Sequence, residues 1–367
     1  MKQQIKNVLK TLLPVKQWTA RFGNLERRRQ EDLLSGHANV QREMQKLQET
    51  LQALKMELDV LRLDQAAVKS GLVDVRREMG YQYYKGLHPD SYIDAIKDWY
   101  KLQTGTALSL DNPRTFNEKI QWLKIYDSTP QKTRLADKYL CRNWVEEKIG
   151  EKYLVPLLGV WDKFDDIDFA ALPNQFVLKA NHGCGWNIIV KDKDTLDKDE
   201  AKRKMDRWLC TNFAFVNNLE LHYKDIPPKI IAEQYLENEG KDLYDYKVWC
   251  FNGKPSFIAF LAERPIGVKI AFHDLDWNLL PFSYLFPRYE KPVPRPDNLD
   301  EILKMAEVLC KDFAHVRVDF YRLDDGSVKF GEMTFTTASG YCIWDPPEYD
   351  LVLGQMLSLP DVDVVSK

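Results

Sequence analysis

The chain has 367 residues, of which 44% are hydrophobic and 12% aromatic, and its formal net charge is −3. This composition supports a large folded core and lacks the basic excess that marks nucleic-acid-binding proteins. The six cysteines form no CxxC pair and the six histidines no HExxH motif, which disfavours structural zinc and a disulfide framework and favours a reducing, cytoplasmic location.

The first 29 residues are strongly basic, because eight lysines and arginines stand against one acid, Glu26, for a local charge of +7. Apolar residues from Ile5 to Leu13 recur at helical spacing but never form the unbroken run that a signal peptide or membrane span needs. A basic amphipathic helix of this kind can lie on an anionic membrane surface, here the inner face of the plasma membrane. The alternatives are a helix packed on the protein's own body and a disordered segment.

Residues 30–80 carry a heptad repeat. Leucine or valine recurs every seven residues from Leu33 to Val75, and leucine and methionine fill most of the companion seam. This pattern predicts a coiled coil of about 70 Å at about 1.5 Å per residue, which ends at Gly80. Because such a seam cannot stay exposed, we expect a homo-oligomer, but leucine at both seam positions does not select the number of chains.

From residue 81 the chain reads as an α+β body, with a short helical segment at 81–130 and the main domain at 131–367. Helices are predicted at 91–101, after Thr115, and at 133–148, 198–217 and 298–313. Strands are predicted at 175–180, 187–190, 229–234, 246–251 and 256–261. A basic, proline-rich loop at 281–296 is either solvated or a contact for an anionic acceptor.

A β-hairpin is predicted from Val316 to Thr334, where an Asp-Gly pair separates two short apolar runs. A two-residue turn would place Leu323 opposite Val328 and Asp319 opposite Glu332. A four-residue loop keeps this register, whereas a three-residue loop would shift it.

Directly opposed carboxylates on one face of a hairpin repel each other, so Asp319 and Glu332 favour a cation between them. Mg²⁺ takes oxygen ligands of this kind and normally brings substrate phosphates with it. Arg317 shares the face and supplies a positive charge for an anionic ligand beside the metal. The alternative is that both acids are simply solvated.

A strand from Phe176 delivers Lys179 into a loop that contains Gly183 and Gly185 and returns as a second strand. Glycines let backbone N–H groups approach a phosphate closely, and the lysine adds a point charge, although an ordinary hairpin would look similar. The loop also holds Cys184 beside a histidine. A Cys/His nucleophile is disfavoured because no third orienting group is evident.

Three further stretches carry candidate polar residues. The buried strand that ends at Glu233 and Gln234 offers a suitable edge for an adenine ring. Asp245 and Lys247 share one face of the strand closed by Asn-Gly, and Lys138 lies near the start of a helix. Each of these is, by itself, also compatible with an ordinary strand end or a solvated side chain.

The order of these features is a lysine strand, a glycine loop, an acidic hinge, a basic strand and a hairpin with paired carboxylates. In this order, from about Asn112 to Pro360, the sequence resembles the TupA-like family of the ATP-grasp superfamily, linked to teichuronopeptide and surface-polysaccharide biosynthesis. The segments that carry the resemblance are TFNEKIQWLK, ADKYL, FVLKANHGCGWNIIV, IIAEQYLEN, DYKVWCFNGK, NLDEILKMAEVL and HVRVDFYR followed by FGEMTFTTASG. The resemblance implies an ATP-grasp fold, in which two α+β lobes clasp ATP, preceded by the long coiled-coil helix.

The nucleotide-binding residues implied by the resemblance lie before a helix, on the lysine strand, in the glycine loop and at the acidic hinge: Lys138, Lys179, Gly183, Cys184, Gly185, Glu233, Gln234, Leu236 and Glu237. The two lysines would touch the phosphates of ATP, and the glycine loop would fold over them. The hinge backbone would hold adenine, and Glu237 or Glu239 would reach the ribose.

The resemblance also implies that Asp319 and Glu332 hold Mg²⁺. Thr334 stands where many ATP-grasp enzymes have asparagine, so one or two metal ions remain open. Arg317 would face the acyl phosphate and the tetrahedral intermediate, and Lys247 would lie near the γ-phosphate. Residues 81–130 are too short for the Rossmann-like domain that usually precedes the two lobes.

The reaction implied is ATP-dependent ligation, in which a carboxylate takes the γ-phosphate and the acyl phosphate is then attacked by an amine. The expected substrates are a sugar acid or a cell-surface glycan precursor together with an amine co-substrate. A glycosyltransferase is one alternative, although the acids lie on facing strands rather than in a DxD motif. A coiled-coil scaffold that binds nucleotide without catalysis is another.

Overall fold

The computed structural model describes residues 44–46, 48, 52, 77–237, 243–262, 267–289 and 291–361. The chain divides into two units, Met1–Arg76 and Arg77–Lys367. The predicted basic segment 1–29 and most of the predicted coiled coil 30–80 lie outside the described residues. The few described residues of the predicted coiled coil before residue 77, at 44–46, 48 and 52, are helical. Among them, Met44 of the heptad seam is 56% exposed in the single chain.

The helix that begins the described body runs over residues 77–85, so the helical conformation continues past Gly80, the residue at which the coiled coil is predicted to end. A glycine inside a helix costs only about 1 kcal/mol relative to alanine, which packing can offset. Tyr81, the next residue, is 8% exposed and anchors this helix in the core.

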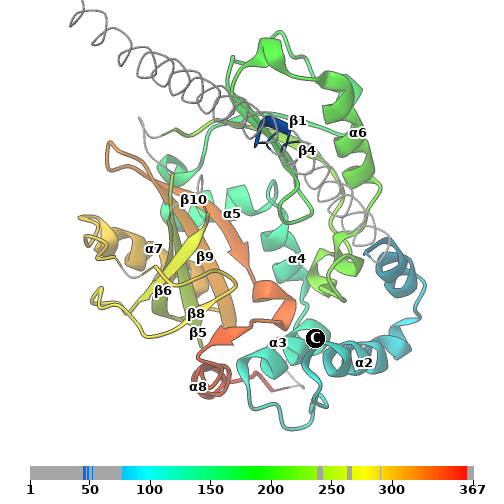
Figure 1. The fold of residues 1–367 in the computed structure, drawn as a ribbon, viewed down its shortest axis with the longest axis vertical. Coiled ribbons are helices and arrows are strands. Elements are labelled where there is room, and N and C mark those ends of the chain that lie inside the picture. The colour runs from blue at the N-terminus through cyan, green and yellow to red at the C-terminus, as the bar shows by residue number, and fades with distance from the viewer. Residues whose placement is uncertain are drawn as a thin grey trace, which may run out of the picture. The chain divides into compact units, whose positions relative to one another are not determined.

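Two antiparallel sheets form the α+β body (Figure 1). The small sheet contains, in spatial order, β1 (Leu157–Trp161), β4 (Ile230–Gln234), β2 (Phe176–Ala180) and β3 (Asn187–Val190). The large sheet contains β10 (Val328–Thr334), β9 (His315–Arg322), β5 (Tyr244–Phe251), β6 (Lys254–Ala262) and β7 (Lys269–His273). The short strands β8 (Ser283–Tyr284) and β11 (Trp344–Asp345) pair with each other, so the predicted basic loop at 281–296 contains a strand.

The named helices of the body are α2 (Tyr92–Thr104), α3 (Phe116–Tyr126), α4 (Pro130–Ala136), α5 (Cys141–Ile149), α6 (Lys198–Leu209), α7 (Leu299–Cys310) and α8 (Tyr349–Met356). The start of α3 is a capping box, in which the Thr115 side chain accepts a hydrogen bond from the Glu118 backbone N–H and the Glu118 carboxylate accepts one from the Thr115 backbone N–H. The predicted helix after Thr115 is therefore confirmed.

The helix predicted over 133–148 is wrong, because the chain leaves the helical conformation at Asp137 and forms α4 and α5 instead. The Asp137 carboxylate accepts hydrogen bonds from the backbone of Tyr139 at 2.8 Å and of Leu140 at 3.1 Å. It also accepts one from the Asn181 side chain at 2.9 Å, just beyond β2. These bonds favour a break over a continuous helix, and they fix the neighbouring Lys138 beside the small sheet.

Alternation of the side chains along the strands gives each sheet two different faces. Helix α7 packs on the face of the large sheet that carries Val248, Val318 and Phe320, and α6 packs on the face of the small sheet that carries Phe176 and Leu178. The intervening residues of the same strands therefore point away from α6 and α7. These are the positions of the charged residues that the sequence singled out.

The register of the β9–β10 hairpin was predicted correctly at the acids and incorrectly near the turn. Val328 pairs with Arg322 rather than with Leu323, because the loop has three residues and ends on Gly326, whose φ is +81°. A bulge at Gly331 then restores the register, and Asp319 pairs with Glu332. A Cβ at Gly331 would lie 3.1 Å from the Asp319 carbonyl oxygen, so the bulge favours glycine.

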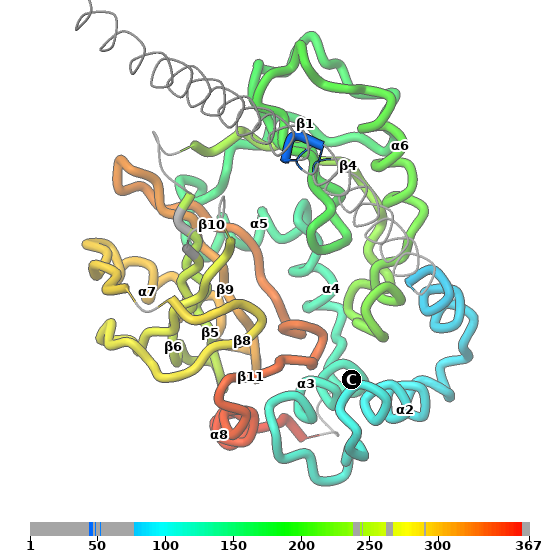
Figure 2. Tube along the Cα trace, viewed as in Figure 1, coloured from blue at the N-terminus to red at the C-terminus, as the bar shows by residue number. Residues whose placement is uncertain are grey.

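Helix α8 packs against α3 at the end of the body shown in Figure 2. A Cβ on Gly354 of α8 would lie 2.2 Å from the Arg114 carbonyl oxygen, whereas one on Gly80 would meet nothing within 4 Å. We therefore expect Gly354→Ala to lower the free energy of unfolding by about 1–3 kcal/mol. Gly80→Ala is the matched control and should raise it by about 0.5–1 kcal/mol. Urea denaturation measures both, and equal effects would contradict this packing.

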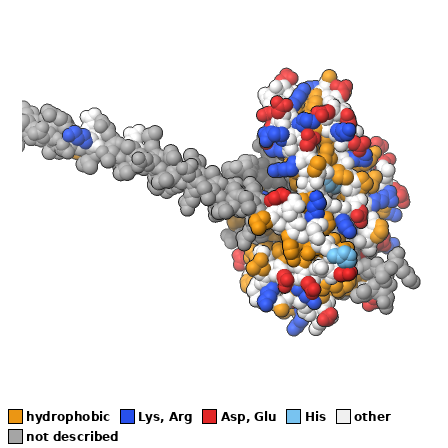
Figure 3. Space-filling view, turned by 90° about the vertical axis from the view of Figure 1, so that its right-hand side faces the viewer, with side chains coloured by type: hydrophobic (Ala, Val, Ile, Leu, Met, Phe, Trp, Pro, Cys, Tyr) orange, Lys and Arg blue, Asp and Glu red, His pale blue; other side chains and the backbone are white. Residues whose placement is uncertain are grey.

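The face turned to the viewer in Figure 3 carries acidic, basic and apolar side chains interspersed with one another. All six cysteines are free thiols. Within the described residues, none of the helices combines the length and the apolar character that crossing a bilayer requires.

Candidate active site

Lys138 is the residue at which the glycine loop of the small sheet approaches the acids of the large sheet. Its ammonium group donates a hydrogen bond to the Gly183 carbonyl oxygen at 2.6 Å. The same group lies 3.6 Å from a carboxylate oxygen of Glu332 on β10. One cation before α5 thus contacts both halves of the predicted site.

Asp319 is the most heavily bonded acid of the site and is 2% exposed. The guanidinium group of Arg317 binds both of its oxygens, with Nε at 2.7 Å from Oδ1 and Nη2 at 2.9 Å from Oδ2. The Lys247 ammonium lies 2.5 Å from Asp319 Oδ2 and 2.9 Å from Asp245 Oδ2. Strands β5 and β9 place these residues side by side, since Lys247 pairs directly with Asp319.

These ion pairs keep the site charged despite its burial. Burial alone would raise the pKa of Asp319, but Arg317 and Lys247 outweigh it and hold that pKa below its ordinary value. Burial likewise opposes the charge of Lys247, and Asp319 and Asp245 outweigh it and raise the pKa of Lys247. Asp319, Lys247 and Arg317 are therefore ionised at neutral pH.

The expectation that the opposed acids by themselves require a metal needs correction. Arg317 Nη2 lies 3.6 Å from Glu332 Oε1 and donates to the Thr334 hydroxyl at 3.1 Å, so its guanidinium bridges Asp319, Glu332 and Thr334. Counting Asp245, the three acids face three cations, Arg317 and the two lysines at 138 and 247. The repulsion that the sequence predicted is already balanced by side chains.

The donor set nevertheless fits Mg²⁺, because the three candidate ligands offer only oxygen atoms. A carboxylate has about four lone-pair sites, and the bonds above use three of those on Asp319, which leaves one on Oδ1. Glu332 is 27% exposed, and in the part of the chain that the structure describes its carboxylate forms no hydrogen bond. Among those residues no three His, Cys, Asp or Glu side chains gather into a metal site, so further ligands would come from phosphate or water.

Lys179 lies on the face of the small sheet that points away from α6. Its ammonium group is 2.6 Å from Glu233 Oε2, and Arg142 of α5 is 2.8 Å from Glu233 Oε1. The Glu233 side chain is 9% exposed. The side chain of Glu233 therefore positions Lys179, a role that the sequence, which assigned Glu233 to the adenine hinge, did not predict.

The glycine loop connects β2 to β3. Gly185 has a φ of +72°, and a Cβ at Gly183 would come within 2.4 Å of the Trp186 ring, so both positions favour glycine. The Cys184 residue as a whole is exposed, but burial around its sulfur raises the pKa of the thiol. His182 bonds the Trp208 carbonyl oxygen at 3.0 Å and Asn181 at 3.2 Å, and neither bond involves the thiol. These contacts do not form a Cys/His nucleophile.

The predicted adenine hinge follows β4. The Gln234 backbone N–H donates to the Pro156 carbonyl oxygen at 3.0 Å and is therefore occupied. Leu236 is half-buried, and no backbone hydrogen bond joins it to another described residue. Glu237 is exposed, and the second ribose candidate, Glu239, lies outside the described residues. Leu236 thus offers the backbone groups that an adenine edge needs.

A scan against protein-family models matches residues 118–358 to the TupA-like ATP-grasp model. The chain belongs to the TupA-like ATP-grasp family. The superfamily of which this family is part consists in general of ATP-dependent ligases. No curated protein matches the chain, and the match gives no support to the glycosyltransferase alternative.

Solved structures that are similar to this TupA-like ATP-grasp chain include the D-alanine–D-alanine ligase of Bacillus anthracis complexed with ATP, at 17% identity and a TM-score of 0.33. The match covers 55% of this chain and 54% of that ligase. A second is the N5-carboxyaminoimidazole synthetase of Staphylococcus aureus complexed with ADP, at 13% identity and a TM-score of 0.35; the match covers 62% of this chain and 53% of the synthetase. A third is the ATP-grasp ligase PsnB with a minimal precursor, at 10% identity and a TM-score of 0.35; the match covers 59% of this chain and 60% of PsnB. The family assignment rests on the family model alone.

One residue of this TupA-like ATP-grasp site, Arg142, escaped the sequence reasoning as a functional candidate. Arg142 binds Glu233, and the available signal was that it follows Lys138 by four residues on a predicted helix. Asp245, which the sequence placed on the same strand face as Lys247, forms an ion pair with that lysine. In the basic loop at 281–296, Arg295 is paired with Asp300 at 2.6 Å.

Proposed function

We propose that the protein is an ATP-dependent carboxylate–amine ligase that acts on a sugar acid or a cell-surface glycan precursor. The observation that carries this proposal is Lys138, which touches the glycine-loop carbonyl and lies beside Glu332, one of the two opposed acids. A nucleotide whose phosphates lie under the loop would therefore reach the acids of the hairpin. The family membership supports the same reaction class.

In this proposal Lys138 and Lys179 neutralise the triphosphate of the substrate ATP. Asp319, Glu332 and Thr334 would hold Mg²⁺, which supplies further charge neutralisation when bound. A carboxylate oxygen of the acid forms a bond to the γ-phosphorus while the bond to the β,γ-bridging oxygen breaks, and ADP leaves. Arg317 is placed to orient the acid and to stabilise the later oxyanion.

In the second step the amine nitrogen attacks the acyl carbon, the carbon–oxygen bond to phosphate breaks, and the nitrogen loses a proton to solvent. The products are an amide, ADP and inorganic phosphate. The Lys247 ammonium lies 2.9 Å from Asp245 and 2.5 Å from Asp319. In this proposal its positive charge keeps the Asp319 carboxylate in the position in which it would hold Mg²⁺.

The experiment is to mix the purified full chain with MgATP and a panel of uronic acids and amino acids. Equimolar release of ADP and phosphate is expected, with a product whose mass equals acid plus amine minus water. Consumption of a nucleotide sugar without any ATP requirement would instead support a glycosyltransferase. ATP binding without product from any pair would support a non-catalytic scaffold.

We also propose that residues 30–80 join copies of the chain and that residues 1–29 contact an anionic membrane surface. The heptad repeat and the exposure of the seam residues Met44 (56%) and Met79 (69%) support the first proposal. Sedimentation of the full chain tests it. Binding to vesicles with and without phosphatidylserine tests the second, because the basic charge should favour anionic lipid.

A further inference from the structure

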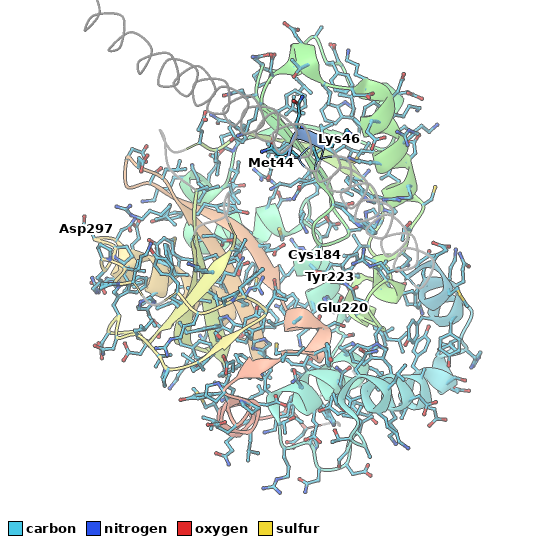
Figure 4. The ribbon with its side chains drawn as sticks, in the orientation of Figure 1. Met44, Lys46, Cys184, Glu220, Tyr223 and Asp297 are labelled. Carbon is cyan, nitrogen blue, oxygen red and sulfur yellow. The ribbon has the colours of Figure 1, made fainter. Side chains whose placement is uncertain are left out.

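Helix α5 has an apolar side that packs on the core of the large sheet and a polar side that contacts the small sheet. Cys141 and Val145 are buried in the same cluster as the inner residues of α7. Lys138 and Arg142, four residues apart, contact the small sheet instead. Lys138 bonds a carbonyl oxygen of the glycine loop, whose middle residue Cys184 is labelled in Figure 4.

The carboxylate of Glu233 joins Arg142 to Lys179. Strands β2 and β4 place Lys179 opposite Ile231, so Glu233, two residues further along β4, is its diagonal neighbour on the same face. The Lys179 ammonium lies 2.6 Å from Glu233 Oε2, and Arg142 Nη1 lies 2.8 Å from Glu233 Oε1. Arg142 Nη2 also donates to the Val155 carbonyl oxygen at 2.6 Å, two residues before β1. The guanidinium is therefore fixed at two points.

These three side chains form a largely buried cluster with two positive charges and one negative charge. Their exposed fractions are 13% for Arg142, 20% for Lys179 and 9% for Glu233. Water and salt therefore screen the charges less than they would on the surface. Lys179 and Glu233 by themselves would be a neutral pair. With Arg142 the two cations exceed the one acid, and the cluster keeps a positive charge for an anionic ligand.

Lys179 has N–H donors left for such a ligand. An ammonium group has three N–H donors, and among the described residues that of Lys179 bonds only Glu233. A phosphate that binds Lys179 competes with the Glu233 carboxylate for the same positive charge. Drawing a cation away from a buried carboxylate is strongly unfavourable when no second cation remains, because the acid is left uncompensated. Arg142 is that second cation.

We propose that Arg142 is a positioning residue for the nucleotide, which balances the charge of Glu233 and so leaves the charge of Lys179 available to the phosphates. The ligand class is the polyphosphate of a nucleoside triphosphate. This inference rests on the proposed ligase function and gives a role to a side chain that acts through two others. Without Arg142, the Glu233 carboxylate and the phosphates would compete for one ammonium group.

The test compares ligands with and without phosphates. The full chain is titrated calorimetrically with a non-hydrolysable ATP analogue at fixed Mg²⁺ and, separately, with adenosine. In Arg142→Met the dissociation constant for the analogue should rise about ten- to a hundredfold, whereas that for adenosine should stay unchanged. Arg134→Met, which replaces an exposed arginine of the preceding helix α4, is the matched control and should bind both ligands as the wild-type chain does.

Glu233→Gln is expected to act in the opposite direction. Glutamine keeps an oxygen that accepts a hydrogen bond from Lys179 but lacks the negative charge, so the analogue should bind at least as tightly as it does to the wild-type chain. Adding Glu233→Gln to Arg142→Met should restore most of the lost affinity, because the charge that the arginine balances is gone. The single Glu233→Gln chain also serves as the test if Arg142→Met does not fold.

Equal affinities of the Arg142→Met and wild-type chains for the analogue would overturn the proposal. An equal loss of affinity for adenosine would overturn it too, as would a loss in Glu233→Gln as large as that in Arg142→Met, because either result indicates a purely structural cluster. The expected set of dissociation constants without a product from any acid and amine would count against the proposed ligase function and not against this role of Arg142.

Discussion

Replacing Asp319 by asparagine and Glu332 by glutamine in one chain is expected to lower ATP-dependent ADP release by about a thousandfold or more. The two changes remove both carboxylates that face each other on β9 and β10. Without them the chain keeps only Thr334 of its three candidate ligands for Mg²⁺ and loses the negative charge that would attract the metal ion. The measurement is ADP release with each acid and amine pair that the wild-type chain accepts.

The single changes separate catalysis from stability. Asp319→Asn also leaves the buried Arg317 and Lys247 without their common partner, which is expected to destabilise the fold by several kcal/mol. Glu332 makes only long ion pairs at 3.6 Å, so Glu332→Gln should keep the fold and still lose activity. Asp325→Asn, at the exposed tip of the same hairpin, is the control and should be fully active. Retained turnover in a folded Glu332→Gln chain would remove the proposed metal site.

Replacing Lys179 by methionine is expected to raise the dissociation constant for ATP about ten- to a hundredfold. A hydrogen bond to a charged group contributes about 1.5–3 kcal/mol, and about 1.4 kcal/mol corresponds to a factor of ten. The fold should be unaffected, because Glu233 keeps its bond to Arg142 at 2.8 Å. Calorimetric titration with a non-hydrolysable ATP analogue measures the change.

Lys229→Met is the matched control for Lys179→Met. Lys229 lies next to β4 and pairs with Asp162 at 2.6 Å on the surface, so its loss should leave nucleotide affinity unchanged. Equal affinities for the Lys179 variant and the wild-type chain would show that this lysine does not contact the nucleotide. The side chain of Glu233 would then be a structural partner only.

The sequence predicted the parts of the site that depend on local pattern. The Asp-Gly turn and the alternation of β9 and β10 were enough to pair Asp319 with Glu332, and Asn252 and Gly253 marked the turn from β5 to β6. The order of the remaining features along the chain, with Lys179 and the glycine loop before the hairpin, is what the resemblance to the family rested on. These features need only a strand period and turn chemistry.

The parts that the sequence did not predict depend on contacts between distant residues. Nothing local shows that Arg317 turns back onto Asp319 at 2.7 Å, or that Glu233 reaches Lys179 and Arg142. The bulge at Gly331 was not predicted. The three-residue loop shifts the strand pairing by one residue and the bulge shifts it back, so a count that assumes a two-residue turn and no bulge also pairs Asp319 with Glu332. Helix α8 was missed because its packing on α3 is a long-range contact.

In the proposed enzyme, a nucleotide and Mg²⁺ bind between Lys179, Lys138 and the acids of the hairpin. A crystal structure of the full chain with a non-hydrolysable ATP analogue and Mg²⁺ is the decisive experiment. The prediction is a metal ion on Asp319 and Glu332, with the triphosphate extending to Lys179. Nucleotide bound elsewhere, or a metal ion away from both acids, would contradict it.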